Sequence, residues 1–142
     1  MSASHRLNCE EMSAEENRAV YGKCNNPHGH GHNYVVEVVV GGEVDPETGM
    51  VCDLGELDRC VMKEIVDRFD FANLNFDAAF QSRVPTTENL NIEIYKVLKA
   101  AFTEAELVEV RVEETAKNLF AYPGAYPGAN EARASSGKAV GV

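Results

Sequence analysis

One short segment, residues 22–34, combines a cysteine with a His-x-His pair, in the order Gly-Lys-Cys-Asn-Asn-Pro-His-Gly-His-Gly-His-Asn-Tyr. Side chains alternate between the two faces of an extended strand, so His30 and His32 on such a segment point to the same side. Two imidazoles on one face are two of the three protein ligands that a catalytic zinc site uses. Because Cys24 precedes the pair by six residues, we expect its thiol to reach a molecule bound at the metal.

The chain contains four histidines, and His5, on a predicted first strand, is the candidate for the third zinc ligand. His28 lies between a proline and a glycine, a context typical of a loop, so we expect it to be a bystander. Any one of these histidines could instead be an ordinary side chain that is hydrogen-bonded within the protein or exposed to solvent. Cys24 taken alone is equally explained as a small buried residue, although Lys23 beside it would favour the thiolate.

Glu114 is a second kind of candidate. On the strand predicted over 107–114, alternate valines at 108, 110 and 112 share one face, and Glu114 continues that parity. A carboxylate at the end of a buried apolar stripe is costly unless a partner donates hydrogen bonds to it. The edge of a planar ligand with adjacent N–H groups, such as a pterin or a guanine, would supply two. The alternative is that the strand ends early and Glu114 faces water.

The chain has 142 residues and a formal net charge of −10, which fits a single domain with its own core. Nucleic-acid binding requires clustered Lys and Arg, and no basic stripe is present, so this function class is excluded. An anionic substrate would have to be held by local positive groups, for which the candidates are Arg6, Arg18, Lys23 and Lys117. Solvated surface charge is the simpler interpretation of any one of them.

No apolar run approaches the roughly 20 residues of a membrane span, and no signal-peptide pattern opens the chain. The four cysteines form no Cys-x-x-Cys pair. We therefore expect reduced thiols in a cytoplasmic protein that does not bind membranes. Neither a Gly-x-Ser-x-Gly motif nor a phosphate-cradling glycine loop occurs, so neither serine nor P-loop chemistry is supported.

Periodicity and turn signals predict the elements that position these residues. In chain order they are a strand over 1–8, a helix over 14–21 opened by the capping box of Ser13 and Glu16, a strand over 33–40, a brief strand over 50–52, a helix over 53–69, a loop over 70–85, a helix over 87–102, and strands over 107–114 and 118–122. The main elements follow the order ββααββ. This order predicts an α+β fold, an antiparallel four-stranded sheet with two helices on one face.

Strand 33–40 is apolar on both faces, so we expect cover on both, by helices and by a partner subunit. Residues 1–122 are expected to form the domain. A doubled Ala-Tyr-Pro-Gly over residues 121–128 and the Ser/Ala/Gly-rich end that follows predict that residues 123–142 form a disordered tail, with a polyproline-II recognition segment as the alternative.

Together these residues resemble the 6-pyruvoyl-tetrahydropterin synthase family, which includes the 6-carboxy-tetrahydropterin synthases. The resemblance covers roughly residues 2–122. It rests on Ser-Ala-Ser-His-Arg-Leu (2–7), Gly-Lys-Cys-Asn-Asn-Pro (22–27), Gly-His-Gly-His-Asn-Tyr (29–34), Gly-Met-Val (49–51), Thr-Thr-Glu-Asn (86–89) and Glu-Thr (114–115). It implies a tunnelling fold, in which the sheets of a trimer join into a barrel and two trimers stack as a homohexamer with active sites at subunit boundaries.

The resemblance also implies a role for each residue. His5, His30 and His32 would bind Zn²⁺. The proton-transferring group would be Cys24, and Glu114 would anchor the pterin ring with help from the turn Thr86-Thr87-Glu88. The family reaction eliminates triphosphate from 7,8-dihydroneopterin triphosphate and rearranges the side chain to two ketones, in the synthesis of tetrahydrobiopterin.

Two features depart from the family pattern. An Asp-His pair works with the cysteine as a proton relay in the family, but here Asp70 is followed by Phe71, which cannot move a proton. Loss of a positioned acid/base group typically costs roughly 100- to 10,000-fold in rate. The first strand is also expected to be short, which would weaken the anchoring of His5.

Four interpretations follow. The first is a zinc-dependent lyase that makes 6-pyruvoyl-tetrahydropterin. The second is a carboxy-tetrahydropterin synthase-like activity that cleaves the side chain, and the third is a weakly active or inactive paralogue that binds zinc and pterin. Phe71 favours the third, whereas the presence of Cys24 and Glu114 opposes it. The fourth is a structural zinc domain, which would have a closed four-ligand site.

Overall fold

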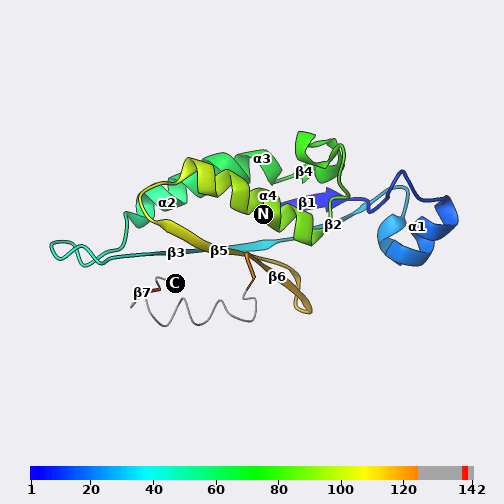
Figure 1. The fold of residues 1–142 in the computed structure, drawn as a ribbon. Helices are drawn as coiled ribbons and strands as arrows, with labels where there is room; N and C mark the ends of the chain where they lie inside the picture. Colours follow the sequence, from blue (N-terminus) through cyan, green and yellow to red (C-terminus); the bar gives the residue numbers. More distant parts are fainter. Residues whose placement is uncertain (125–138, 141–142) are drawn as a thin grey trace.

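In the computed structural model, which describes residues 1–124 and 139–140, the strands are divided between two sheets (Figure 1). One sheet has the order β2-β1-β4 and is built from β1 (Ser2–His5), β2 (His30–Asn33) and β4 (Ala72–Asn73). The other has the order β6-β5-β3-β7 and is built from β3 (Val35–Gly42), β5 (Glu106–Thr115), β6 (Asn118–Tyr122) and β7 (Ala139–Val140).

The predicted α+β class is confirmed, and β3, β5 and β6 pair antiparallel in one sheet, but the predicted first strand lies in the other sheet, so a single sheet of all four strands is not formed. The chain leaves the first sheet at Tyr34, whose backbone N–H and C=O both bond to Met1, and enters the second sheet at Val35. Of the predicted strand over 33–40, Asn33 is thus the last residue of β2, and residues 35–40 belong to β3 in the other sheet. The first strand is shorter than the predicted 1–8, and residues 50–52 form no strand.

The segment 70–85, predicted as a loop, contributes β4 and two 3₁₀ turns, η3 (Leu74–Phe76) and η4 (Ala78–Phe80). β4 runs parallel to β1, with Ala72 opposite Ala3, so the first sheet is mixed rather than antiparallel. A two-residue parallel pairing has no periodic pattern that sequence could reveal, since the pairing depends on long-range contact with β1.

Helix α1 (Ala14–Tyr21) begins as predicted: the Ser13 hydroxyl accepts from the Glu16 N–H, and the Glu16 carboxylate accepts from the Ser13 N–H. Asn17 is 2% exposed and exchanges hydrogen bonds with the backbone of Cys9. These bonds hold α1 against the chain that follows β1. A 3₁₀ turn, η1 (Gly22–Asn25), comes directly after it.

The helix predicted over 53–69 is present, with a π-turn in its middle. It comprises α2 (Leu54–Val61), η2 (Met62–Val66) and α3 (Asp67–Phe69). Its core-facing side chains, Leu57, Val61, Ile65 and Phe69, recur every four residues. Four residues overshoot an α-helical turn by about 40°, and the looser winding of the π-turn brings Ile65 and Phe69 back into the core, where both are 0% exposed.

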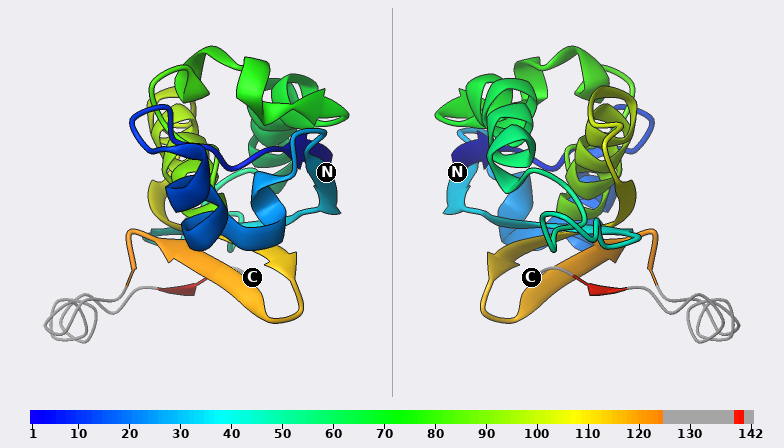
Figure 2. Two further views of the ribbon diagram at one scale, coloured as in Figure 1. Left: turned by 90° about the vertical axis from the view of Figure 1, so that its right-hand side faces the viewer. Right: turned by 90° about the vertical axis from the view of Figure 1, so that its left-hand side faces the viewer.

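Helix α4 (Thr87–Ala101) packs its buried Leu90, Ile94 and Leu98 against β5. Figures 1 and 2 show α2, α3 and α4 on one side of the sheet that contains β3, β5 and β6. On the other side of this sheet Val35 and Leu119 are 54% and 56% exposed. Of the two faces of strand 33–40 that were predicted to be covered, helices thus cover one.

Within residues 1–124 and 139–140, no helix is both long and apolar enough to cross a bilayer. The disordered tail predicted over 123–142 lies largely outside the described residues and stays a prediction. Ala139 and Val140 pair with Gly42 and Gly41 of β3.

Candidate active site

The three histidines predicted to bind a metal lie together at the point where β1 and β2 pair. The antiparallel register sets His5 directly opposite His30, and His32 follows on the same face two residues later. The two Nε2 atoms of His5 and His30 are 3.1 Å apart, and one ligand nitrogen from each of the three rings lies within 4.8 Å of the others. The period-two alternation that the sequence predicted is thus what assembles the cluster.

His5 is oriented by a contact on its far side. Its Nδ1 lies 2.8 Å from the carbonyl oxygen of Pro85, and the side chain is 1% exposed. A carbonyl can only accept, so Nδ1 carries the proton and Nε2 presents its lone pair to the other histidines. This bond to a second-layer group is the usual way in which a metal-binding histidine is held. His5 is therefore firmly anchored although β1 is only four residues long.

The cluster has the properties of a metal-binding donor set. His30 Nδ1 and His32 Nε2 are buried and have no hydrogen-bond partner among the described residues. Burial lowers the pKa of His5 and, with the charge of His32, that of His30, so both favour the neutral form that binds metals. An all-imidazole donor set of this kind fits a divalent transition metal with an open coordination position.

Glu114, from β5, lies beside the cluster, as its parity on the strand predicted. Its Oε1 is 3.5 Å from His32 Nε2 and 3.7 Å from His5 Nε2, and its side chain is 13% exposed. The Thr87 hydroxyl donates to Oε1 at 2.7 Å, and the Asn118 amide donates to Oε2 at 3.2 Å. Burial acts to raise the pKa of Glu114, but these two hydrogen bonds and the nearby imidazoles outweigh it, and the pKa lies below its usual value.

Cys24 lies in η1 and is half-buried. Its carbonyl accepts a hydrogen bond of 2.9 Å from the Leu7 N–H, which ties η1 to the chain just after β1. Burial raises the pKa of the Cys24 thiol, and the negative charge of Glu114 raises it further. Burial and Glu114 therefore both favour the thiol form of Cys24, opposite to the effect expected of Lys23, and that expectation stays a prediction.

The three residues of the predicted ring-holding turn have separate positions. Thr87 is 4% exposed and contacts Glu114. Thr86 is the N-cap of α4, where its hydroxyl accepts from the Asn89 N–H, and Glu88 is exposed in the first turn of that helix. The structure brings Thr87 alone of the three into contact with Glu114.

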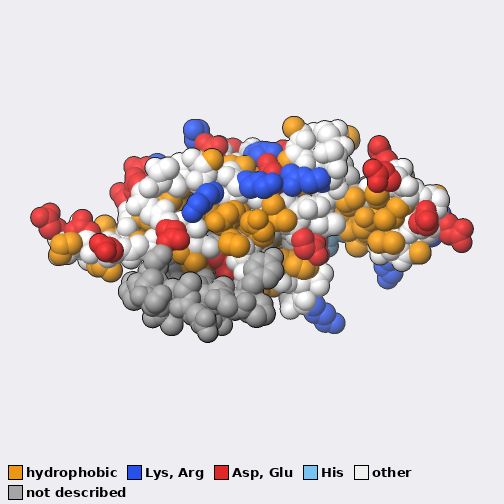
Figure 3. Space-filling view, viewed as in Figure 1, with side chains coloured by type: hydrophobic (Ala, Val, Ile, Leu, Met, Phe, Trp, Pro, Cys, Tyr) orange, Lys and Arg blue, Asp and Glu red, His pale blue; other side chains and the backbone are white. Residues whose placement is uncertain are grey.

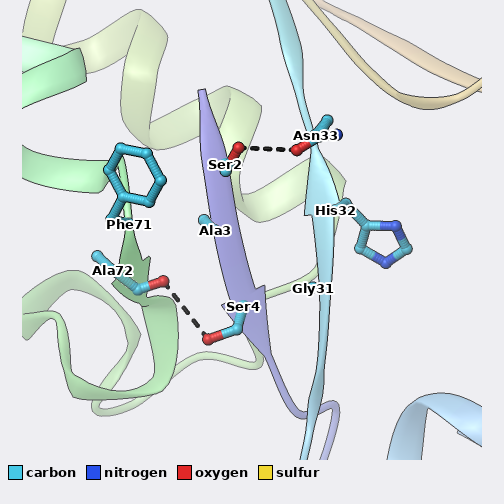
Figure 4. Close-up of a pocket in the computed structure, with 8 residues that line it drawn as sticks. All are labelled: Ser2, Ala3, Ser4, Gly31, His32, Asn33, Phe71 and Ala72. Carbon is cyan, nitrogen blue, oxygen red and sulfur yellow. Dashed lines mark hydrogen bonds between the residues drawn. The ribbon is translucent and has the colours of Figure 1, made fainter.

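Asp70 and Phe71 lie just before β4, which is on the opposite side of β1 from β2 and its two histidines. Asp70 Oδ1 accepts from the Ser2 N–H at 2.6 Å, so its carboxylate holds β1. Phe71 is 90% exposed with a φ of 55°. It lines a cavity of about 350 Å³ together with residues of β1 and β2, and Figure 4 shows the His32 ring pointing away from Phe71, on the far side of β2. Within the described residues, Asp70 does not bond to the histidine cluster.

Sequence reasoning missed three groups at this site. Tyr34 is 2% exposed, and its hydroxyl lies 3.4 Å from His5 Nδ1. It shares the parity of His30 and His32, so the same alternation could have identified it. The Pro85 carbonyl and the Asn118 amide carry no comparable signal, because both reach the site through tertiary contacts.

Comparisons with known proteins show what this chain is similar to. A family model described as 6-pyruvoyl tetrahydropterin synthase matches residues 1–125. A protein named 6-pyruvoyl tetrahydrobiopterin synthase from Poecilia reticulata is 48% identical over 124 residues, which cover 87% of this chain and 84% of that protein. A protein of the same name from Homo sapiens is 45% identical, with 87% and 86% covered. The solved structure of Caenorhabditis elegans 6-pyruvoyl tetrahydropterin synthase is 45% identical with a TM-score of 0.82, covering 88% of this chain and 90% of that chain.

Proposed function

The chain belongs to the 6-pyruvoyl tetrahydropterin synthase family, and on this premise we propose that it is a zinc-dependent lyase of tetrahydrobiopterin biosynthesis. Its substrate is 7,8-dihydroneopterin triphosphate, and its products are 6-pyruvoyl-tetrahydropterin and triphosphate. The names of its relatives support this reaction. The observation that carries the proposal is the convergence of Glu114 with His5, His30 and His32.

Glu114 is the proposed pterin anchor. The pKa of this carboxyl group is lowered, so it is ionised at neutral pH and can accept two hydrogen bonds from adjacent N–H groups of a pterin ring. Thr87 and Asn118 fix one oxygen each and so set the plane of the carboxylate. Thr86 and Glu88 support this part of the site through the start of α4.

The three histidines are the proposed zinc ligands, since an all-imidazole donor set with an open position is typical of catalytic zinc. Bound there, zinc supplies a Lewis acid that acidifies the side-chain hydroxyl groups of the substrate. The contact between His5 and Pro85 keeps the imidazole in the orientation that binding requires.

Cys24 is the proposed proton carrier. It takes a carbon-bound proton from the substrate side chain and returns a proton at another carbon, while the C–O bond to the triphosphate breaks and its electron pair leaves with the triphosphate. The rearrangement is internal to the substrate, so no redox cofactor is required. Because the pKa of the Cys24 thiol is raised, the thiol must first be deprotonated. The resemblance to the family makes Asp70 the candidate for assisting that deprotonation.

Product analysis by mass spectrometry tests the proposal. Zinc-loaded protein is incubated with 7,8-dihydroneopterin triphosphate, and pterin products and released triphosphate are measured together. We expect 6-pyruvoyl-tetrahydropterin with triphosphate in equal amounts, lost in Cys24→Ala and kept in Cys9→Ala, a matched change at a cysteine whose thiol has no partner among the described residues. A carboxy-pterin product would assign the sister activity instead.

The second candidate function is a zinc- and pterin-binding protein with little or no catalysis. Phe71, where the family pattern has a histidine, is the observation that favours it, together with the bond from Asp70 to Ser2. This candidate predicts that folded, metal-bound protein binds the pterin but releases neither product. An exchangeable water on the bound metal would separate both candidates from a structural zinc domain with four protein ligands.

We also propose a homohexamer of two stacked trimers in which the sheets join into a barrel. The exposure of the apolar Val35 and Leu119 on the helix-free side of the second sheet supports a surface there that another subunit covers. Native mass spectrometry should give six chains per particle, and a monomer at micromolar concentration would contradict this assembly. The four free cysteines are consistent with the proposed cytoplasmic location.

A further inference from the structure

A second cavity, of about 330 Å³, lies where α1 and η1 meet the chain that follows β1. Figure 1 shows α1 and this chain at the end of the molecule beyond β1 and β2. Three cations line the cavity, Arg6, Arg18 and Lys23, with the asparagines Asn8, Asn25 and Asn26 between them. No Asp or Glu from the described part of the chain lines it. Such a lining of cations and amides is suited to an anion.

None of these three cations forms an ion pair with a carboxylate among residues 1–124. Among residues 1–124, ion pairs with carboxylates occupy Arg59, Lys63, Arg68, Arg83 and Arg111. Six cations of this part of the chain form no ion pair, and three of the six converge on this cavity. Figure 3 shows acidic side chains around α1, so the lining differs in charge from the surface next to it. In a chain of net charge −10, such a gathering of unpaired cations is unexpected for surface charge alone.

The cavity walls are held in place. The buried Asn17 fixes α1, and with it the position of Arg18, through its bonds to the Cys9 backbone. Asn25 donates to the Leu7 carbonyl at 2.8 Å and to Asn8 at 2.9 Å. The Arg6 Nε donates to the Asn25 carbonyl at 3.3 Å, which leaves the remaining guanidinium N–H groups free for a ligand.

Residues that line the cavity are adjacent in sequence to residues of the candidate active site. Lys23 and Asn25 are the neighbours of Cys24, and Arg6 directly follows the metal-ligand candidate His5. The chain thus links the cavity lining directly to the proposed proton carrier Cys24 and to a metal-ligand candidate. The reaction proposed above has a substrate with a strongly anionic triphosphate at the end of its side chain.

We propose that the cavity lined by Arg6, Arg18 and Lys23 binds the triphosphate group of the pterin substrate. The planar guanidinium groups give two parallel hydrogen bonds to phosphate oxygens, and Lys23 contributes a point charge. The inference rests on the proposed function for the identity of the substrate. It explains how a protein of net charge −10 holds a polyanion, since the positive charge is concentrated where the triphosphate lies.

The test uses the full-length, metal-loaded protein, and isothermal titration with inorganic triphosphate as the probe. Arg18→Gln/Lys23→Gln removes two exposed cations of the lining, and Lys96→Gln/Lys99→Gln removes two exposed, unpaired lysines of α4 as the matched control. We expect the first variant to bind triphosphate roughly 10- to 100-fold more weakly than the wild type, since each lost bond joins two charged groups. The control should bind as the wild type does. Equal affinity in the wild type and the first variant would overturn the proposal.

A second measurement assigns the anion to the substrate. The KM for 7,8-dihydroneopterin triphosphate should rise at least about 10-fold in the first variant, whereas its affinity for 7,8-dihydroneopterin, which lacks the triphosphate, should stay unchanged. Weaker binding of inorganic triphosphate with an unchanged KM would mean that the cavity takes free triphosphate and would overturn the assignment. If no pterin product forms at all, the proposed function fails and no KM can be measured. The affinities for 7,8-dihydroneopterin triphosphate and 7,8-dihydroneopterin, measured by direct binding, then decide the role of the cavity.

Discussion

The Thr87 hydroxyl donates a 2.7 Å hydrogen bond to Oε1 of Glu114 across the contact between α4 and β5. Thr87 is the first residue of α4, and its side chain is almost completely buried. The bond therefore couples the start of the helix to the carboxylate beside the histidine cluster. It gives Glu114 a defined orientation before any ligand arrives.

Thr87→Val, which keeps the shape of the side chain, should lower the affinity for the pterin. Without the hydroxyl, Oε1 loses its donor, so the carboxylate is less ordered and costlier to keep buried, by about 1–3 kcal/mol. We expect about 10-fold weaker pterin binding in titration calorimetry and a lower Tm. Thr103→Val, at an exposed position after α4, is the control, and an equal loss in both variants would contradict a specific role for Thr87.

His5→Ala should abolish stoichiometric metal binding, because it removes one of the three nitrogens of the cluster. The loss in affinity should exceed the roughly 10- to 100-fold that changes in second-layer residues cost. Metal content after dialysis, measured by mass spectrometry, should fall well below one ion per chain.

His28→Ala is the matched control for the metal prediction, since His28 is exposed and lies outside the cluster. It should retain one ion per chain. Loss of metal in His28→Ala with retention in His5→Ala would reassign the ligand set.

Phe71→His should raise turnover by about 100-fold or more, the scale on which a positioned acid/base group contributes. The variant is expected to fold, because Phe71 is 90% exposed and its φ of 55° is adopted more readily by histidine than by most residues. Phe76→His, at another exposed phenylalanine, should leave the rate unchanged. No gain in Phe71→His would indicate a site rebuilt around the phenylalanine.

Asp77→Asn should destabilise the protein at neutral pH and not in acid. The hydrogen bonds from Arg68, at 2.8 and 2.7 Å, hold the pKa of Asp77 below its usual value. A carboxyl group with a lowered pKa in the folded state stabilises that state above its unfolded-state pKa, and the stabilisation is lost as the pH falls through the folded-state value. Asparagine can still cap η4, so the change isolates the charge.

We expect Asp77→Asn to lose about 1–3 kcal/mol of unfolding free energy at pH 7 in urea titrations. The difference from the wild type should shrink as the pH falls below about 4. Asp58→Asn, at an exposed position of α2, is the control, and its unfolding free energy should not differ from that of the wild type in a pH-dependent way. If Asp77→Asn remained equally destabilised in acid, Asp77 would act through its shape rather than its charge.

Local rules predicted much of this molecule from its sequence. The capping box of Ser13 and Glu16, the apolar stripe that ends at Phe69, and the shared face of His30 and His32 all depend on residues close in the chain. The parity of Glu114 with Val112 on β5 is of the same kind. Sequence periodicity predicts which residues share a face, because a helix or a strand repeats its side-chain directions at a known interval.

Tertiary structure alone decided how these pieces meet. The break at Tyr34 that makes two sheets, the parallel pairing of Ala72 with Ala3, and the bond from Thr87 to Glu114 join residues that no local period relates. The same holds for the convergence of Arg6, Arg18 and Lys23 on one cavity. The sequence gives the number of cationic residues and the net charge of the chain. Only packing determines which of these cations remain without a carboxylate partner and line the same cavity.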